Sequence, residues 1–413
     1  MTAETPISPG SRVDWRTTLL VVLAGCLIAM IGFGIRSVFG LFMDPMISAK
    51  GWSRETFSLA LAIQNLLWGI GVPIAGILAD KFGPSRVLGL GAVVYAIGVY
   101  GMAESTSSGM LHLTAGVLTG TGVAFTAFSL ALAAMAKAVG PARRTMALGL
   151  GTAAGSFGQV VFSPVSQQFI AQYGWHDSLF ILSSLALLII PLAMVLPKSD
   201  GGKNESTVDQ SVRQALSEAV SHRGYILLTI GFFVCGFHVA FITVHFPSYV
   251  RDVGLNPLVG AVALSLVGLC NIMGSFLSGV IGQRYSKKST LSVIYLLRAV
   301  CITALLLAPK TEFTIYAFAA AMGFLWLSTV PLTTGIVAQV FGVRYMATLF
   351  GVVFFSHQLG SFLGVYLGGY LYDTTGTYDA VWWAGVVLGI VAAIIHWPIN
   401  ETPMARLRPA PSS

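Results

Sequence analysis

Five ionisable side chains lie inside apolar stretches that are long enough to cross a bilayer. They are Arg36, His238, His245, Arg298 and His357. An ionisable group at membrane depth is costly, so each is a candidate functional residue. A guanidinium offers paired, coplanar donors that suit a carboxylate, and a histidine can carry a proton near physiological pH. These residue types predict a site for an organic anion, with a proton as a possible coupling ion.

The composition predicts that these residues are held by membrane helices. The chain has 413 residues, of which 55% are hydrophobic and 9% are charged, whereas soluble proteins carry about 25% charged residues. A membrane helix needs about 20 apolar residues, and about twelve stretches reach this length. We therefore expect an all-α membrane protein with twelve transmembrane helices. The stretches lie near 17–44, 54–79, 87–104, 110–137, 145–172, 178–197, 224–250, 258–281, 289–308, 312–340, 345–372 and 379–399.

The net charge of +7 follows membrane topology. Lys and Arg gather in the termini and in alternate loops, which predicts that both termini are cytoplasmic in a cell inner membrane. This placement argues against a nucleic-acid partner. The four cysteines lack metal-ligand spacing, and the chain lacks phosphate-loop and catalytic motifs. We expect no enzyme activity, cofactor or metal.

A polar segment at 198–223 divides the chain into related halves, 17–197 and 224–399, flanked by cytoplasmic segments 1–16 and 400–413. Residues are repeated between the halves. Ala60-Leu61 through Gly76 corresponds to Ala263-Leu264 through Gly279, and Ala147-Leu148 through Gly151 corresponds to Ala347-Thr348 through Gly351.

The stretch from Gly76 to Arg86 is a short charged turn between two apolar runs. With Gly76, Asp80, Lys81, Gly83 and Arg86, it resembles the signature loop of the major facilitator superfamily, although the basic residue is one position late. The resemblance implies two pseudo-symmetric six-helix bundles with a substrate site between them. It also implies a cytoplasmic gate formed by Asp80, Lys81, Arg86, Arg143 and Arg144.

The segments Gly149–Pro164, Phe33–Gly40 and Gly51–Arg54 resemble bacterial relatives of the monocarboxylate transporters. This resemblance implies a secondary transporter of small monocarboxylates, such as lactate or pyruvate, usually with a proton. The chain departs from the animal members in span eight, where Asn271 and Ser275 stand in place of an acidic residue and an arginine.

The internal repeat aligns Gly34-Ile35-Arg36 with Gly236-Phe237-His238, and the resemblance implies that spans one and seven face each other. We hypothesise that Arg36 holds the substrate carboxylate while His238, with His357, carries the proton. Polar residues that could also contact a substrate are Gln64, Gln159, Asn271 and Ser328.

Structural interpretations of these residues remain open. Arg36 could extend to the outer membrane interface, and His238 could be a satisfied core histidine. His245 is expected at the interface, and Arg298 is expected to pair with helix carbonyls or lipid headgroups.

Two other functions also remain open: an oxalate/formate-type anion exchanger, or a carrier of a larger solute such as a vitamin or drug. Span four reads Gly116-x-x-x-Gly120-x-Gly122 and lacks the arginine of drug antiporters, which counts against drug export. We expect the protein to work as a monomer in the lipid bilayer.

Overall fold

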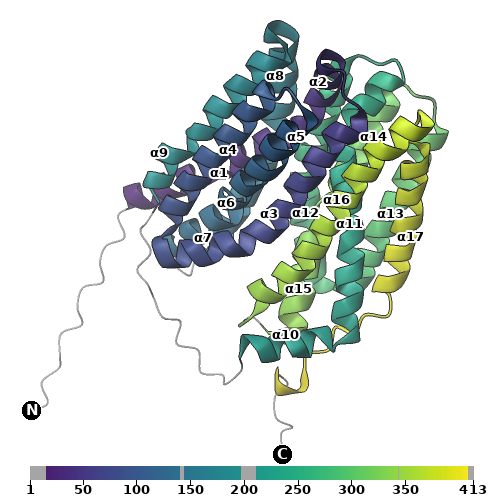
Figure 1. The fold of residues 1–413 in the computed structure, drawn as a ribbon. Helices are drawn as coiled ribbons and strands as arrows, with labels where there is room; N and C mark the ends of the chain where they lie inside the picture. Colours follow the sequence, from purple (N-terminus) through teal and green to yellow (C-terminus); the bar gives the residue numbers. More distant parts are fainter. Residues whose placement is uncertain (1–14, 140–143, 197–210, 343, 408–413) are drawn as a thin grey trace, which may run out of the picture.

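The computed structural model describes residues 15–139, 144–196, 211–342 and 344–407. These residues form helices and connecting turns, with no strand among them (Figure 1). Three predicted segments lie partly outside this part of the chain. They are the cytoplasmic N-terminus at residues 1–14, the linker at residues 198–210 and the tail at residues 408–413. Arg143 also lies outside it, and Arg144 is described by its backbone alone.

The N-terminal half contains α1 to α9. Their bounds are α1 Trp15–Ser37, η1 Phe39–Phe42, α2 Met43–Lys50, α3 Arg54–Phe82, α4 Pro84–Glu104, α5 Ser108–Leu111, η2 His112–Leu118, α6 Thr119–Phe125, α7 Phe128–Ala138, α8 Arg144–Leu187 and α9 Ile189–Met194.

The C-terminal half follows α10, a short helix in the predicted linker. Its bounds and those of the later helices are α10 Val212–Val220, α11 Arg223–Asp252, α12 Pro257–Arg284, α13 Lys287–Leu307, α14 Glu312–Leu325, α15 Thr329–Phe341, α16 Met346–Thr375, α17 Asp379–His396 and η4 Ala405–Leu407.

Length and apolar composition select eleven segments of the described chain that could cross a membrane. One of them, Met146–Met194, is 49 residues long and contains two spans. They are separated at Gly174, where φ is 80° and the backbone is not helical. Glycine tolerates this left-handed conformation, so the segment turns back there. The arrangement agrees with the twelve spans that the sequence predicts.

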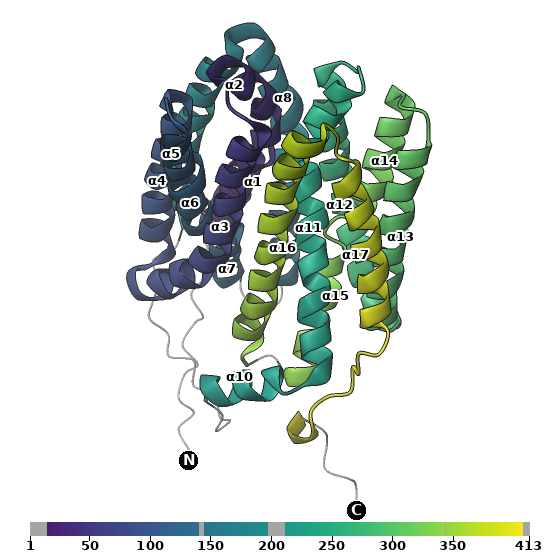
Figure 2. The ribbon, with the colours of Figure 1, turned by 45° about the vertical axis from the view of Figure 1, so that its right-hand side comes forward.

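The two halves lie side by side, with α3 packed against α16 and α8 packed against α12 (Figures 1 and 2). The short helix α10 runs across the lower end of the C-terminal half, and η4 lies at the same end. The signature turn also folds as expected, because Gly83 has a φ of 87° and Pro84 opens α4. Proline is favoured at the first position of a helix, where no backbone donor is needed.

Candidate functional site

Arg36 lies in the last turn of α1 and reaches toward the middle of α3. Its Nη2 donates a hydrogen bond of 2.6 Å to Oδ1 of Asn65. The guanidinium carbon lies 4.2 Å from the ring centre of Trp68, within the range of a cation–π contact. We call the surrounding hollow the Arg36 cleft. It is lined by Gly32, Phe33, Arg36, Trp68, Val123, Thr126 and Ala127.

The charge of Arg36 has no counter-charge in the described chain. No described carboxylate lies within 4.0 Å of its guanidinium, and its buried Nε has no hydrogen-bond partner. An amide oxygen orients a guanidinium without neutralising it, so the cation remains available to an anion. The guanidinium lies between α1, α3 and the α6–α7 junction, which disagrees with the alternative that it extends to the membrane interface.

The Arg36 cleft lies against a break in a membrane helix. The fourth span is interrupted at Thr126 and Ala127, between α6 and α7, and both residues line the cleft. The tenth span is interrupted between α14 and α15 at the corresponding place in the repeat. Interrupted helices at corresponding positions of two halves mark binding sites in several transporter folds.

The break in the C-terminal half is held by Arg298. This fully buried side chain donates to the carbonyl of Leu325 at 2.8 Å and also to that of Trp326. A cation at the C-terminal end of α14 is favoured by the helix dipole. Arg298 was expected to pair either with helix carbonyls or with lipid headgroups, and in the structure it pairs with helix carbonyls.

His238 and Arg36 do not meet in this conformation. The His238 ring is 1% exposed, and its Nε2 lies 2.7 Å from the carbonyl oxygen of Gly385 on α17. The imidazole turns toward its own half. The shared volume expected for Arg36 and His238 is therefore absent here.

His357 is connected to the Arg36 cleft by a chain of aromatic contacts. Trp68 meets Phe354 of α16 edge to face, with ring centres 5.4 Å apart. Phe354 stacks on His357 at 5.7 Å, and His357 Nδ1 lies 3.2 Å from Oε1 of Gln358. Of the two histidines proposed to carry a proton, His357 thus connects to the cleft.

Three of the other predicted substrate contacts bond to helices. Gln159 donates from Nε2 to the carbonyl of Leu264 at 3.0 Å, and Asn271 donates to Ser156 Oγ at 3.0 Å. Both bonds join α8 to α12 and therefore connect the two halves. Ser328 donates to the carbonyl of Phe324 in its own half, while Gln64 is buried and its Nε2 has no partner.

The predicted cytoplasmic gate lies only in part within the described residues. Asp80, Lys81 and Arg86 are exposed, and no ion pair recorded for the described chain includes them. Their predicted partners Arg143 and Arg144 have no described side chains.

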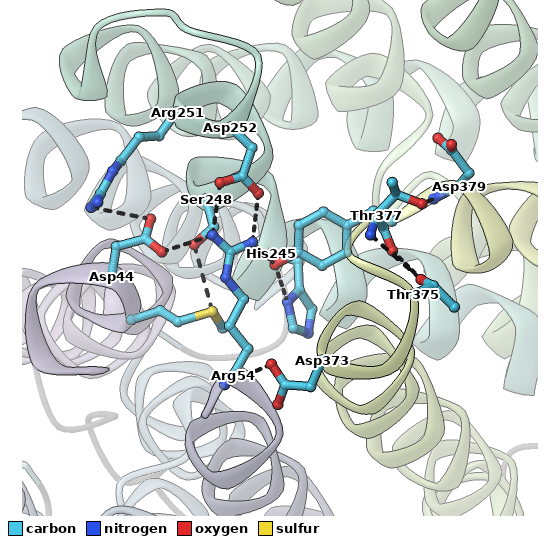
Figure 3. Close-up of polar contacts among 12 residues, drawn as sticks. Asp44, Arg54, His245, Ser248, Arg251, Asp252, Asp373, Thr375, Thr377 and Asp379 are labelled. Atoms are coloured by element: carbon cyan, nitrogen blue, oxygen red, sulfur yellow. Dashed lines mark hydrogen bonds and ion pairs between the residues drawn. The ribbon is translucent and has the colours of Figure 1, made fainter. Parts of the chain in front are cut away.

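Among the residues that the structure describes, the ion pairs that join the two halves lie at the opposite end, around Arg54 (Figure 3). Arg54 makes a two-pronged contact with Asp252, with Nη1–Oδ2 and Nη2–Oδ1 distances of 2.5 and 2.7 Å. Its Nη2 also donates to Asp44 at 3.2 Å. The carboxylate of Asp373 accepts from the backbone N–H groups of Arg54 and Glu55 at the start of α3. We call the set Arg54, Asp44, Asp252, Asp373, Tyr378 and His245 the Arg54 cluster.

Tyr378 and His245 complete the cluster with a directed hydrogen-bond chain. Arg54 Nη1 donates to Tyr378 Oη at 2.9 Å, and that hydroxyl lies 3.1 Å from His245 Nδ1. His245 Nε2 lies 2.8 Å from the carbonyl of Val365, so Nε2 carries the proton and Nδ1 accepts. Burial raises the pKa of the Tyr378 phenol against the opposing effect of Arg54, so the hydroxyl stays protonated and donates.

The ring of His245 faces the interior of the protein at the Arg54 end of the spans. This residue was expected at the membrane interface, yet it is fully buried between α11, α16 and Tyr378. No sequence pattern indicated the Arg54 cluster either, although Gly51-Trp52-Ser53-Arg54 stood out as a motif. Charges at the ends of apolar runs look like interface anchors until their partners are known.

The chain matches the Major Facilitator Superfamily over residues 25–365 and 262–412. Among similar curated proteins, Monocarboxylate transporter 13 of Rattus norvegicus is 26% identical, over 87% of this chain and 84% of that protein. The uncharacterized MFS-type transporter YcxA of Bacillus subtilis (strain 168) is 25% identical, over 87% of this chain and 90% of its own.

Solved structures of transporters share the fold at low sequence identity. A bacterial homolog of the human lysosomal transporter Spinster, inward-facing and unoccupied, superposes with a TM-score of 0.76 at 15% identity, covering 94% of this chain and 97% of that chain. A point mutant of the nucleoside transporter NupG gives 0.73 at 14% identity, covering 92% of this chain and 99% of that chain.

Proposed function

The chain belongs to the major facilitator superfamily and is a transporter rather than an enzyme, and from this premise we propose that its substrate is a small organic anion. The proposed class is a monocarboxylate such as lactate or pyruvate, moved across the inner membrane by alternating access. The protein acts as a monomer with both termini in the cytoplasm.

The observation that carries this proposal is the uncompensated charge of Arg36. A cation held in a cleft by an amide and an indole, with no described carboxylate beside it, attracts a negatively charged ligand. The cleft also lies at a helix break, as binding sites in transporters often do. The relatives named monocarboxylate transporters support the same class of substrate.

The Arg54 cluster is proposed to close the extracellular side. Basic residues gather at the other end of the spans, which the positive-inside rule assigns to the cytoplasm. The hydrogen bonds and ion pairs between the halves lie between mid-depth and the Arg54 end of the described chain. The state described here is then closed outward and able to exchange substrate with the cytoplasm.

The proton is proposed to travel on His357, which the contacts above connect to the cleft. One observation favours a second candidate, an anion exchanger of the oxalate/formate type. His238 is bonded to Gly385, and a permanently charged arginine binds an anion without any proton.

Uptake into reconstituted vesicles tests the proposal. Labelled lactate, pyruvate and oxalate are offered with and without an inward proton gradient, and with and without internal anion. Proton-driven uptake supports the symporter, whereas uptake that needs internal anion supports the exchanger. Absence of uptake for every anion would contradict both.

Substitutions of Arg36 test its proposed role in binding the anion. We expect Arg36→Gln to lower anion uptake by at least about tenfold, since a hydrogen bond to a charged group contributes about 1.5–3 kcal/mol. Arg36→Lys keeps the charge but loses the paired donors of the guanidinium. Its uptake should lie between that of the wild type and that of Arg36→Gln. Arg213→Gln, on the exposed side of α10, is the matched control. Normal uptake by Arg36→Gln would refute the site.

A further inference from the structure

His245 is a titratable side chain enclosed at the Arg54 end of the spans. It is 0% exposed, and its ring packs against those of Phe241 and Tyr378, with ring centres 5.4 and 5.2 Å away. On the side of α16, a Cβ atom built on Gly368 would overlap His245 Nε2, so the helix backbone reaches the imidazole directly. Water therefore does not reach the ring while this end is closed.

The hydrogen bonds of His245 fit only the neutral ring. Nε2 donates to the carbonyl of Val365 at 2.8 Å, and Nδ1 accepts from the Tyr378 hydroxyl at 3.1 Å. The oxygen of that hydroxyl also accepts from Arg54 Nη1 at 2.9 Å (Figure 3). A second proton on the ring would set an N–H at Nδ1 against a hydroxyl that already donates to it. The same hydroxyl would then lie between two cations.

The charges around His245 do not offset such a proton. Arg54 faces the ring from α3 through the Tyr378 hydroxyl, and the carboxylates are bonded elsewhere. Asp252 of α11 and Asp44 of α2 pair with Arg54, while Asp373 of α16 accepts from backbone N–H groups at the start of α3. No described carboxylate lies within 4.0 Å of the imidazole, and a buried cation without a counter-charge is costly. Other titratable or charged side chains around the cluster, none of which bonds to the imidazole in the described chain, are Glu55, Tyr249, Arg251, Tyr372 and Asp379.

Opening of this end changes what the Tyr378 hydroxyl can do. Tyr378, Val365 and His245 belong to the C-terminal half, whereas Arg54 belongs to the N-terminal half. Separation of the halves therefore removes Arg54 and exposes the hydroxyl to water. The hydroxyl can then accept from a protonated Nδ1 and donate to water. It can also deliver that proton, because it takes one proton from water while it passes its own to Nδ1.

We infer that His245 is a proton-binding site and that a proton bound there keeps the Arg54 end open. The open end accepts the proton and the closed end does not, so a lower pH shifts the population toward the open end. This site is separate from the one proposed on His357. The inference rests on the proposed closure by the Arg54 cluster, and it is independent of which anion is carried.

The test measures opening of this end as a function of pH. Full-length protein without its natural cysteines carries spin labels on cysteines introduced at Thr106 and Thr374, which are exposed and in opposite halves. Pulsed electron resonance gives the populations of short and long distances. An ordinary histidine titrates near about pH 6.5 and an ordinary aspartate near about pH 3.9. Between about pH 8 and about pH 5 the ratio of open to closed protein should therefore rise about tenfold, the effect of one histidine proton.

Two substitutions should remove this pH response. His245→Gln keeps an N–H for the Val365 carbonyl but cannot take up a proton in this range, and Tyr378→Phe keeps the ring but removes the hydroxyl. His176→Gln is the matched control. Both nitrogens of His176 contact carboxylates of its own half, Glu104 and Asp177, so this variant should respond to pH as the wild type does.

A measurement on the protein with His245 in place covers the case in which a variant fails to fold. In protein labelled with ¹⁵N at histidine, the fraction of His245 that is doubly protonated should follow the open fraction at each pH. A wild-type distance distribution that does not change with pH would overturn the inference, and so would a full pH response in His245→Gln. Arg54→Gln separates the two proposals. If it lengthens the distance while pH does not, closure by the Arg54 cluster stands and only the present inference fails.

Discussion

The Asn65 side chain accepts a hydrogen bond from Arg36 at 2.6 Å without changing the charge of the cleft. Its own Nδ2 donates to the carbonyl of Leu61 one turn earlier on α3, which fixes which end of the amide faces Arg36. An amide in this position orients the guanidinium and leaves its positive charge for a ligand. A carboxylate in the same position would form a buried ion pair and compete with the substrate.

We therefore predict that Asn65→Asp lowers anion uptake by at least about tenfold, since a charge-assisted bond within the protein would replace one to the substrate. The measurement is initial uptake of labelled lactate at equal protein density in the vesicles. Asn256→Asp is the matched control, because Asn256 caps the exposed start of α12 and aspartate caps helices equally well. Undiminished uptake by Asn65→Asp would show that the charge of Arg36 is not used.

At the scale of the helices, the Arg54 cluster ties the start of α3 to the end of α11 and to the turn before α17. The side chains of Arg54 and Asp44 are 9% and 10% exposed, so this is a largely buried group of charges. Removing one member of such a group leaves the others uncompensated, at a cost of about 3–5 kcal/mol. The remaining carboxylates would also repel each other across the boundary between the halves.

We predict that Arg54→Gln shifts the protein toward the state that is open at this end. Spin labels on cysteines introduced at Thr106 and Thr374, both exposed and in opposite halves, would report the change by pulsed electron resonance in a protein without its natural cysteines. The inter-label distance should lengthen. Arg251→Gln is the control. The Arg251 side chain is half exposed and its contact with Asp44 is long, at 3.7 Å, and an exposed ion pair of this kind contributes little to stability. An unchanged distance distribution in Arg54→Gln would contradict a locking role.

The helices and their count could be predicted from the sequence because apolar length is a local property. The Arg54 cluster could not, since its partners Asp252 and Asp373 lie 198 and 319 residues away. Arg36 was recognisable as a cation in an apolar run, whereas Trp68 looked like any aromatic residue of a membrane helix. The repeat paired His238 with Arg36, but side-chain direction depends on packing, and the His238 ring is bonded to the carbonyl of Gly385.

Across the whole molecule, the two halves come into close backbone contact at glycines, which have no side chain to keep them apart. A Cβ atom built on Gly40 would lie 2.5 and 2.6 Å from the backbone carbonyl oxygens of Thr243 and Val244 on α11. One on Gly369 of α16 would lie 2.7 Å from the carbonyl oxygen of Arg54. Backbone atoms cannot move aside as a flexible side chain can, so these contacts require glycine. They lie at the same end as the Arg54 cluster, which therefore closes by backbone contact as well as by charge.

We predict that Gly40→Ala prevents full closure of this end and slows transport, because the halves would have to stay apart to accommodate one methyl group. The spin labels at Thr106 and Thr374 should again report a longer distance, and uptake should fall by at least about tenfold if overpacking costs about 1–3 kcal/mol in the closed state alone. Gly89→Ala on α4 is the matched control, since no atom lies within 4 Å of its added Cβ. Combining Gly40→Ala with Arg54→Gln separates the two effects. If both substitutions act on the same closed state, the double variant should populate the open state more than either single variant. Normal closure in Gly40→Ala would instead mean that the halves adjust at this contact and that charge alone holds the end shut.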